Sequence, residues 1–106
     1  IQRYAVTMVS GSAGALGNNT VLTPTAGHRI RLSYVSYNPA GAVEAAFRFG
    51  SAGALFLRNS VAANSVIAKD FGPARYMEGG VNEPLVLNLS AAVGTIWNVG
   101  YQEVRS

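Results

Sequence analysis

The fold is decided by the stretch Glu83-Pro-Leu-Val-Leu-Asn-Leu-Ser-Ala-Ala-Val-Gly-Thr-Ile-Trp-Asn-Val-Gly-Tyr-Gln-Glu-Val104. Its first part has the period of a half-buried strand, because Leu85, Leu87 and Leu89 recur at every second residue. After a short turn containing Ala and Gly, the same period returns and places on one side Thr95, Trp97, Val99 and Tyr101. Two such runs joined by a few turn residues predict an antiparallel hairpin, to which Trp97 brings the largest apolar side chain in the sequence.

The rest of the chain alternates in the same way, in short runs separated by Gly, Pro or Asn. These runs predict strands at 3–9, 20–23, 28–38, 43–49, 54–58, 64–71 and 75–78. On the longest of them Ile30, Leu32 and Tyr34 are expected to face the core, and the strong turn signal after it predicts a hairpin with 43–49. The inward side chains expected from that partner are Val43, Ala45, Phe47 and Phe49.

No helical period of 3.6 residues persists for three turns anywhere in the sequence, because Gly or Pro interrupts every window. Eight or nine short strands remain, with turn signals about every 8–12 residues. The sequence therefore predicts an all-β chain that forms a single antiparallel β-sandwich or jelly-roll-like domain.

The N-terminal part differs in composition from the remainder. The predicted strand at 3–9 is followed by Ser-Gly-Ser-Ala-Gly-Ala-Leu-Gly-Asn-Asn at 10–19, which predicts a flexible loop. The run has neither of the glycine spacings that cradle phosphate, and no helix follows it. We therefore expect 1–19 to be an N-terminal strand plus a glycine-rich loop that acts as a contact arm, and 20–106 to be the β-sandwich domain.

Charged side chains make up only 12% of the 106 residues, about half the usual share. A surface so poor in charge indicates that other subunits cover much of it. The net charge of +3 comes from eight cations and five acids without any run of Lys or Arg, so no nucleic-acid partner is expected. No apolar run reaches the ~18–20 residues that span a bilayer, so no membrane partner is expected either.

The residues that catalysis or metal binding would need are few and scattered. The sequence has no cysteine and one histidine, His28, whereas a zinc or iron site needs three or four ligands. A serine triad would require His28 with Asp70, the only aspartate, but no serine lies in a G-x-S-x-G turn. Glu78 and Glu83 are the one carboxylate pair that a bend brings within reach. We therefore expect no catalytic residue, no metal and no cofactor, and a chain that is not an enzyme.

Candidate protein-contact residues come from the outward side of the longest predicted strand. Arg29, Arg31 and Tyr37 are expected to face away from the core together. Tyrosine and arginine are enriched where interfaces bury an anchor, and an exposed tyrosine also suits a single stacking platform for a ligand. Leu16, within the segment 10–19, is the fourth candidate contact residue.

Two segments together resemble a known family. One reads Thr25-Ala-Gly-His-Arg-Ile-Arg-Leu-Ser-Tyr-Val, followed by Ala-Gly-Ala-Val-Glu-Ala-Ala-Phe-Arg-Phe at 40–49, and the other spans 83–101 of the stretch quoted above. The pattern is similar to that of small β-sandwich structural proteins of tailed bacteriophages, namely capsid decoration (cement) proteins and modules of head or tail fibres. The resemblance covers about residues 25–104, and its most specific parts are 26–32 and the run L-N-L-S-A-A-V at 87–93.

The resemblance implies a non-enzymatic virion structural protein on the capsid surface. Such a protein would bind the major capsid protein or other virion proteins and stabilise the capsid through protein–protein contacts. Analogy favours a homo-oligomer, and a trimer in particular. The alternative is a carbohydrate- or receptor-binding β-sandwich module of a phage tail fibre or a secreted protein that uses Tyr37 and loop residues. A small hydrolase with Glu78 and Glu83 facing each other in a cleft is a third hypothesis.

Overall fold

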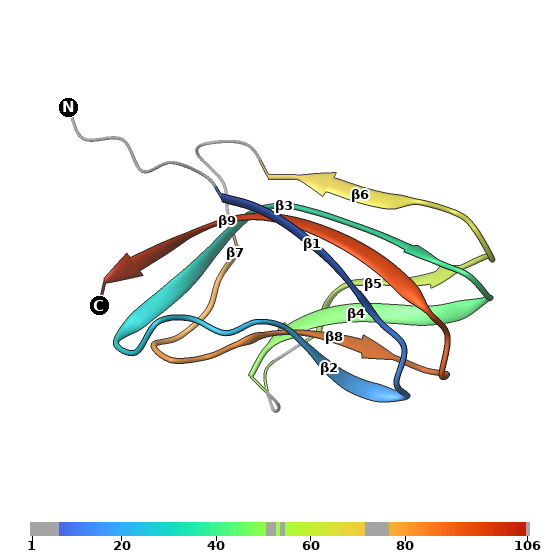
Figure 1. The fold of residues 1–106 in the computed structure, drawn as a ribbon, viewed down its shortest axis with the longest axis horizontal. Coiled ribbons are helices and arrows are strands. Elements are labelled where there is room, and N and C mark those ends of the chain that lie inside the picture. Colours follow the sequence, from blue (N-terminus) through green and yellow to red (C-terminus); the bar gives the residue numbers. More distant parts are fainter. Residues whose placement is uncertain (1–6, 51–52, 54, 72–76, 106) are drawn as a thin grey trace.

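Nine strands and no helix are found in the part of the chain that the computed structural model describes, residues 7–50, 53, 55–71 and 77–105. The strands are β1 (Thr7–Ala13), β2 (Gly17–Leu22), β3 (His28–Pro39), β4 (Val43–Phe49), β5 (Phe56–Val61), β6 (Ile67–Asp70), β7 (Met77–Glu78), β8 (Leu85–Leu89) and β9 (Thr95–Arg105). They form two antiparallel sheets packed face to face (Figure 1). The predicted all-β sandwich is confirmed.

The order of the strands in each sheet shows how the chain is wound. Sheet A contains β1, β9, β3 and β6 in that order, and β7 also pairs with β3, while sheet B contains β2, β8, β4 and β5. The pairs are nested along the chain, with β1–β9 and β2–β8 enclosing β3–β6 and β4–β5. This nesting is that of a long two-stranded ribbon folded over into two sheets, which is a jelly roll.

Both predicted hairpins are wrong, because each joins strands that lie in different sheets. β3 belongs to sheet A and β4 to sheet B, and β9 and β8 are divided in the same way. The connections at 40–42 and 90–94 therefore pass from one sheet to the other, and a hydrogen bond from Ala40 N to Gly94 O (2.8 Å) holds them side by side. Alternation shows which side of a strand is buried, but it does not show whether the next strand pairs beside it or packs across from it.

The segment 10–19 is not the loop that its glycines predicted. β1 continues to Ala13 in an unbroken seven-residue ladder with β9, and β2 begins at Gly17. Gly11 serves packing, since it lies opposite Trp97 and a Cβ atom there would come within 2.5 Å of Trp97 Cζ2. Residues 3–6 of the predicted first strand lie outside the described residues, and the contact arm predicted for 1–19 stays a prediction.

The other differences from the predicted strands concern their ends. β5 continues three residues past its predicted end, to Val61, and residue 54 of its predicted range lies outside the described residues. β6 covers only the second half of the predicted run 64–71. β7 contains the last two residues of the run predicted at 75–78, and 75–76 lie outside the described residues.

The core between the sheets consists mostly of side chains predicted to face inward. Those with no exposed surface are Ile30, Leu32, Phe47, Leu85, Leu87 and Val99. On β3, however, the alternation breaks at Ser33, because the pairing with β9 shifts by one residue between Leu32 and Tyr34. Such a β-bulge turns all later side chains to the opposite face. Tyr37 therefore points into the core and Tyr34 points outward, the reverse of the prediction, and Val35 is buried on the same side of the strand as Tyr37.

The packing of Trp97 under Gly11 makes a testable prediction. Gly11→Ala places a methyl group against the indole ring, and such overpacking should lower the free energy of unfolding by about 1–3 kcal/mol. Gly14→Ala is the matched control, because the nearest atom to a Cβ there lies at 3.7 Å. Urea unfolding measures both variants, and equal stability of the two would contradict this packing.

Candidate functional site

The outer side of sheet A, turned away from sheet B, is almost without charge on one half of its length. Its side chains are those that alternate with buried ones: Met8, Ser10 and Ser12 of β1, Ile96, Asn98 and Gly100 of β9, Tyr34, Ser36 and Asn38 of β3, and Ala68 and Asp70 of β6. We call these residues the neutral face. Asp70, at its margin on the edge strand β6, is its only charged member.

Cross-strand pairing brings these side chains into rows. Ser10 lies opposite Asn98, Asn98 opposite Ser36, and Ser36 opposite Ala68. The next row contains Ile96, whose side chain is 59% exposed, and at the other end Met8 is 58% exposed. Small hydroxyl, amide and apolar groups can be covered by another protein without the cost of desolvating a charge. The neutral face is therefore suited to a protein contact.

Sequence reasoning placed Ile96 on the side opposite Trp97, and the structure confirms that position. It did not single out Ile96 or Met8 as contact residues, although the alternation around Trp97 already pointed Ile96 outward. The complete face was not visible in the sequence, because the Ser33 bulge decides which residues of β3 belong to it.

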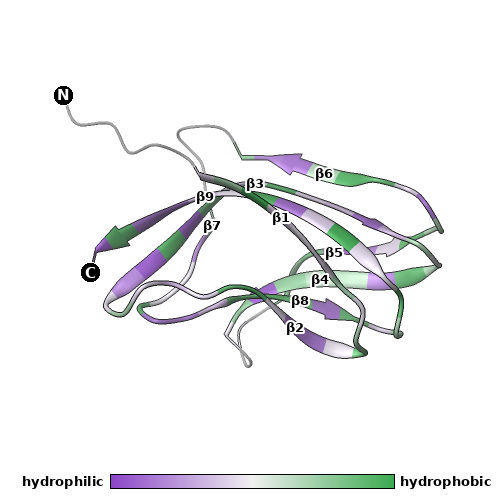
Figure 2. Ribbon diagram, viewed as in Figure 1, coloured by the Kyte–Doolittle hydropathy of each residue, from purple (hydrophilic) through white to green (hydrophobic). Residues whose placement is uncertain are grey.

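A cluster of three charged residues of sheet A lies at the opposite end, before the bulge in β3. Arg31 Nε donates to Glu78 Oε2 at 2.5 Å, and Arg29 Nη1 donates to Glu78 Oε1 at 3.3 Å. β7 brings the carboxylate there, since Glu78 is the cross-strand neighbour of Arg31. Figure 2 shows hydrophilic residues at the projecting ends of β3 and β9 near the C-terminus. Arg29 and Arg31 therefore face outward as predicted, but they bind a carboxylate of the same chain.

The hydrogen bond from Arg31, with a smaller contribution from Arg29, lowers the pKa of Glu78 below its ordinary value of 4.5. A lowered pKa in the folded state means that ionised Glu78 stabilises the fold at pH values above the unfolded pKa. That contribution is lost as the pH falls through the folded pKa. All three side chains are partly exposed, so solvent screening keeps the contribution small.

Glu78→Gln should therefore lower the free energy of unfolding by about 0.2–1 kcal/mol at pH 7. The difference from the native chain should shrink as the pH falls below the ordinary glutamate pKa and close once Glu78 is protonated in the folded state as well. Urea unfolding over this pH range measures it. A difference that does not change with pH would show that the ion pair is not its cause.

Tyr37 is not the exposed contact residue that was predicted. Its side chain is 1% exposed, and its ring meets Phe47 edge to face with the ring centres 5.6 Å apart. The Tyr37 hydroxyl lies 3.4 Å from the carbonyl oxygen of Leu57, and burial raises the pKa of that hydroxyl. Because of the bulge at Ser33, the residue has no surface on which a partner or sugar could stack.

Leu16 lies on the short connection between β1 and β2, and its side chain is 67% exposed. The structure thus separates the four candidate residues: Arg29 and Arg31 at the charged end, Leu16 on a connection and Tyr37 in the core. It does not bring them together as one surface.

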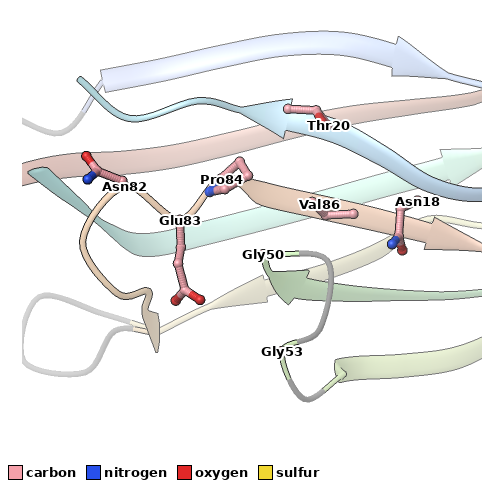
Figure 3. Close-up of a pocket in the computed structure, with 8 residues that line it drawn as sticks. All are labelled: Asn18, Thr20, Gly50, Gly53, Asn82, Glu83, Pro84 and Val86. Carbon is pink, nitrogen blue, oxygen red and sulfur yellow. The ribbon is translucent and has the colours of Figure 1, made fainter. Parts of the chain in front are cut away.

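An open groove of about 570 Å³ lies on the other layer, beside β2 and β8 (Figure 3). Its lining residues are Asn18, Thr20, Gly50, Gly53, Asn82, Glu83, Pro84 and Val86. Its polar side chains already hold the chain in place: Asn82 Oδ1 accepts from Gly27 N (2.7 Å), Glu83 Oε1 from Gly80 N (2.7 Å), and Asn18 Oδ1 from Asn88 Nδ2 (2.8 Å). None of the eight lining residues is aromatic, so the groove offers no stacking platform for a sugar.

The residues considered for catalysis have separate partners. Glu78 binds two arginines while Glu83 accepts from a backbone amide, and the lowered pKa of Glu78 is opposite to what a general acid needs. His28 Nδ1 lies 3.1 Å from the carbonyl oxygen of Ala26. Among the described residues, no three His, Asp or Glu side chains gather in a way that would hold a metal ion. In the same part of the chain, no helix is long and apolar enough to cross a membrane.

Comparisons with known proteins add no family. No protein-family model matches the chain, and no curated protein matches its sequence. The likeness of residues 25–104 to phage β-sandwich proteins therefore stays a hypothesis, and the neutral face is the surface on which we build the functional proposal.

Proposed function

We propose that the chain is a non-enzymatic structural protein of a bacteriophage virion. It binds the capsid surface as a decoration protein and stabilises the capsid through contacts with the major capsid protein. The neutral face carries this proposal, because it is an outer sheet surface with exposed Met8 and Ile96 and a single marginal charge. The resemblance of residues 25–104 to phage structural proteins supports the same role.

The distribution of charge supports a contact through this face. The ion pairs of Glu78 lie before the bulge, away from the neutral face, and the ion pair of Arg58 with Glu44 (2.5 Å) lies on sheet B. The buried centre of a protein interface is depleted in charged residues relative to the rest of the surface. Contact through the neutral face therefore leaves these two groups of ion-paired side chains intact, and Asp70 at its margin is the one charged member that the contact would reach.

The size of the face indicates how such a contact works. The neutral face covers four strands spaced about 4.8 Å apart and about five residues along each strand, so its area is roughly 300 Å². This is less than the ~800 Å² that each partner buries in a standard interface. One neutral face therefore binds weakly by itself. A capsid presents many equivalent positions, and linking two or more faces in one assembly raises the overall affinity without any new type of contact.

The jelly roll itself is compatible with this role but does not select it. Jelly rolls occur in viral capsid proteins and also in lectins, so the fold alone leaves both classes open. The lectin-like alternative used an exposed Tyr37 together with loop residues, and Tyr37 is buried, so only the loop residues remain to it. We therefore base the proposal on the surface and not on the fold.

The test is co-sedimentation of the purified chain with capsid shells of its phage that lack it. Ile96→Glu should weaken binding about tenfold or more, because burying an unpaired carboxylate costs more than the ~1.4 kcal/mol that a factor of ten represents. Leu55→Glu is the matched control, because Leu55 is an exposed apolar residue beside β5 of the other sheet. A native chain that stays in the supernatant contradicts the proposal, and so does equal binding by the two variants.

A further inference from the structure

β1 ends sheet A with one side of its backbone unpaired. It pairs with β9 over all seven of its residues without a shift, and no other described strand pairs with its second edge. Its sequence, TMVSGSA, contains neither charge nor proline. An edge of this kind presents free N–H and C=O groups in a regular row and is a template for another strand.

The other edge strands lack this combination. β7, which pairs only with β3, has two residues and carries Glu78. β6 has four residues and carries Lys69 and Asp70. β5 has a register shift with β4, a left-handed backbone at Leu57 (φ 52°) and the exposed charge of Arg58. Bulges and charges are the means by which proteins keep sheet edges from pairing.

The edge strand β2 is interrupted as well. Its pairing with β8 shifts between Thr20 and Leu22, so its regular ladder covers only four residues. The Asn19 side chain folds back on its own neighbourhood, where Nδ2 donates to Ala15 O (2.8 Å) and Oδ1 accepts from Ala15 N (3.2 Å). Of the described edge strands, β1 alone is long, regular and uncharged.

We propose that two copies of this chain associate by antiparallel pairing of β1 with β1. Full overlap of the seven residues places the twofold axis at Ser10, the middle of the strand. Ser10 then faces the partner's Ser10, and Met8 faces the partner's Ser12. On the inner side Val9 faces the partner's Gly11. No like charges meet, so the edge is complementary to itself, as a twofold interface requires.

A second copy is the occupant that the described edges favour. Head-to-tail pairing would need a different edge as the acceptor, and β2, β5 and β6 are each interrupted or charged. The twofold pair therefore gives a dimer in place of the trimer that analogy favoured. It joins two neutral faces side by side, since Met8, Ser10 and Ser12 belong to both the edge and the face. The inference does not depend on what the face binds.

Light scattering across a wide range of chain concentrations tests the association. The native chain should approach twice the mass of one chain as its concentration rises. Ser10→Lys should raise the concentration needed by about tenfold or more, because two like charges then meet at the axis. Ser60→Lys is the matched control, because Ser60 is an exposed serine of the edge strand β5. Circular dichroism verifies that each variant is folded.

A cysteine variant tests the register independently of stability. The sequence has no cysteine, so Ser10→Cys introduces a single thiol. Directly opposed residues of antiparallel strands have Cα atoms about 4.5–5.5 Å apart, which lies within the range of a disulfide. Mild oxidation should link Ser10→Cys chains far faster than Ser60→Cys chains.

The outcomes separate this inference from the proposed function. A monomer at every concentration, a trimer, a dimer that Ser10→Lys leaves unchanged, or equal linking of the two cysteine variants would each overturn the β1 pairing. If the native chain fails to bind capsid shells but forms a dimer that Ser10→Lys dissociates, the decoration role is overturned and the β1 pairing is left intact.

Discussion

The pairing of β3 with β9 shifts by one residue at Ser33, and the two ends of sheet A differ because of this shift. The extra residue is anchored on both sides: the Ser33 hydroxyl donates to Gly100 O (3.2 Å), and its carbonyl oxygen accepts from Phe71 N (2.8 Å). Before the bulge, Arg31 lies on the outer side of sheet A; after it, Ser36 takes that side but is only 6% exposed, and Tyr37 fills the core beside Phe47. A single inserted residue thus determines both the aromatic core and the exposed surface.

The chemistry of that surface follows from the positions of the charged side chains of sheet A. The arginines of β3 lie on the near side of the bulge, where β7 supplies Glu78, and the outer residues after the bulge are uncharged apart from Asp70. A sheet side that faced only water would ordinarily carry more charge, since polar and charged residues alternate outward on such strands. The same absence of charge extends along β1 to the end of the sheet. Face and edge therefore form one continuous surface suited to proteins.

The period of two was sufficient to predict the regular strands and most of the core. β4 has the predicted bounds, and Leu85, Leu87 and Leu89 are buried as expected. Three features were missed for physical reasons. The bulge leaves no signature beyond an ordinary serine, so Tyr37 was assigned to the wrong face. The two hairpins were predicted wrongly because a strand buries the same side whether the next strand pairs beside it or crosses to the other sheet. The glycine at position 11 permits close packing of Trp97, whereas composition alone indicated flexibility.

Hydrogen–deuterium exchange of the native chain, measured at low and high concentration, tests most directly whether the open edge of sheet A is an interface. In an edge strand, alternate N–H groups point away from the sheet and exchange rapidly unless a partner strand covers them. Pairing of β1 with β1 predicts that peptides covering 7–13 become protected as concentration rises, while those of β5 and β6 do not change. Exchange in β1 that is independent of concentration would contradict it.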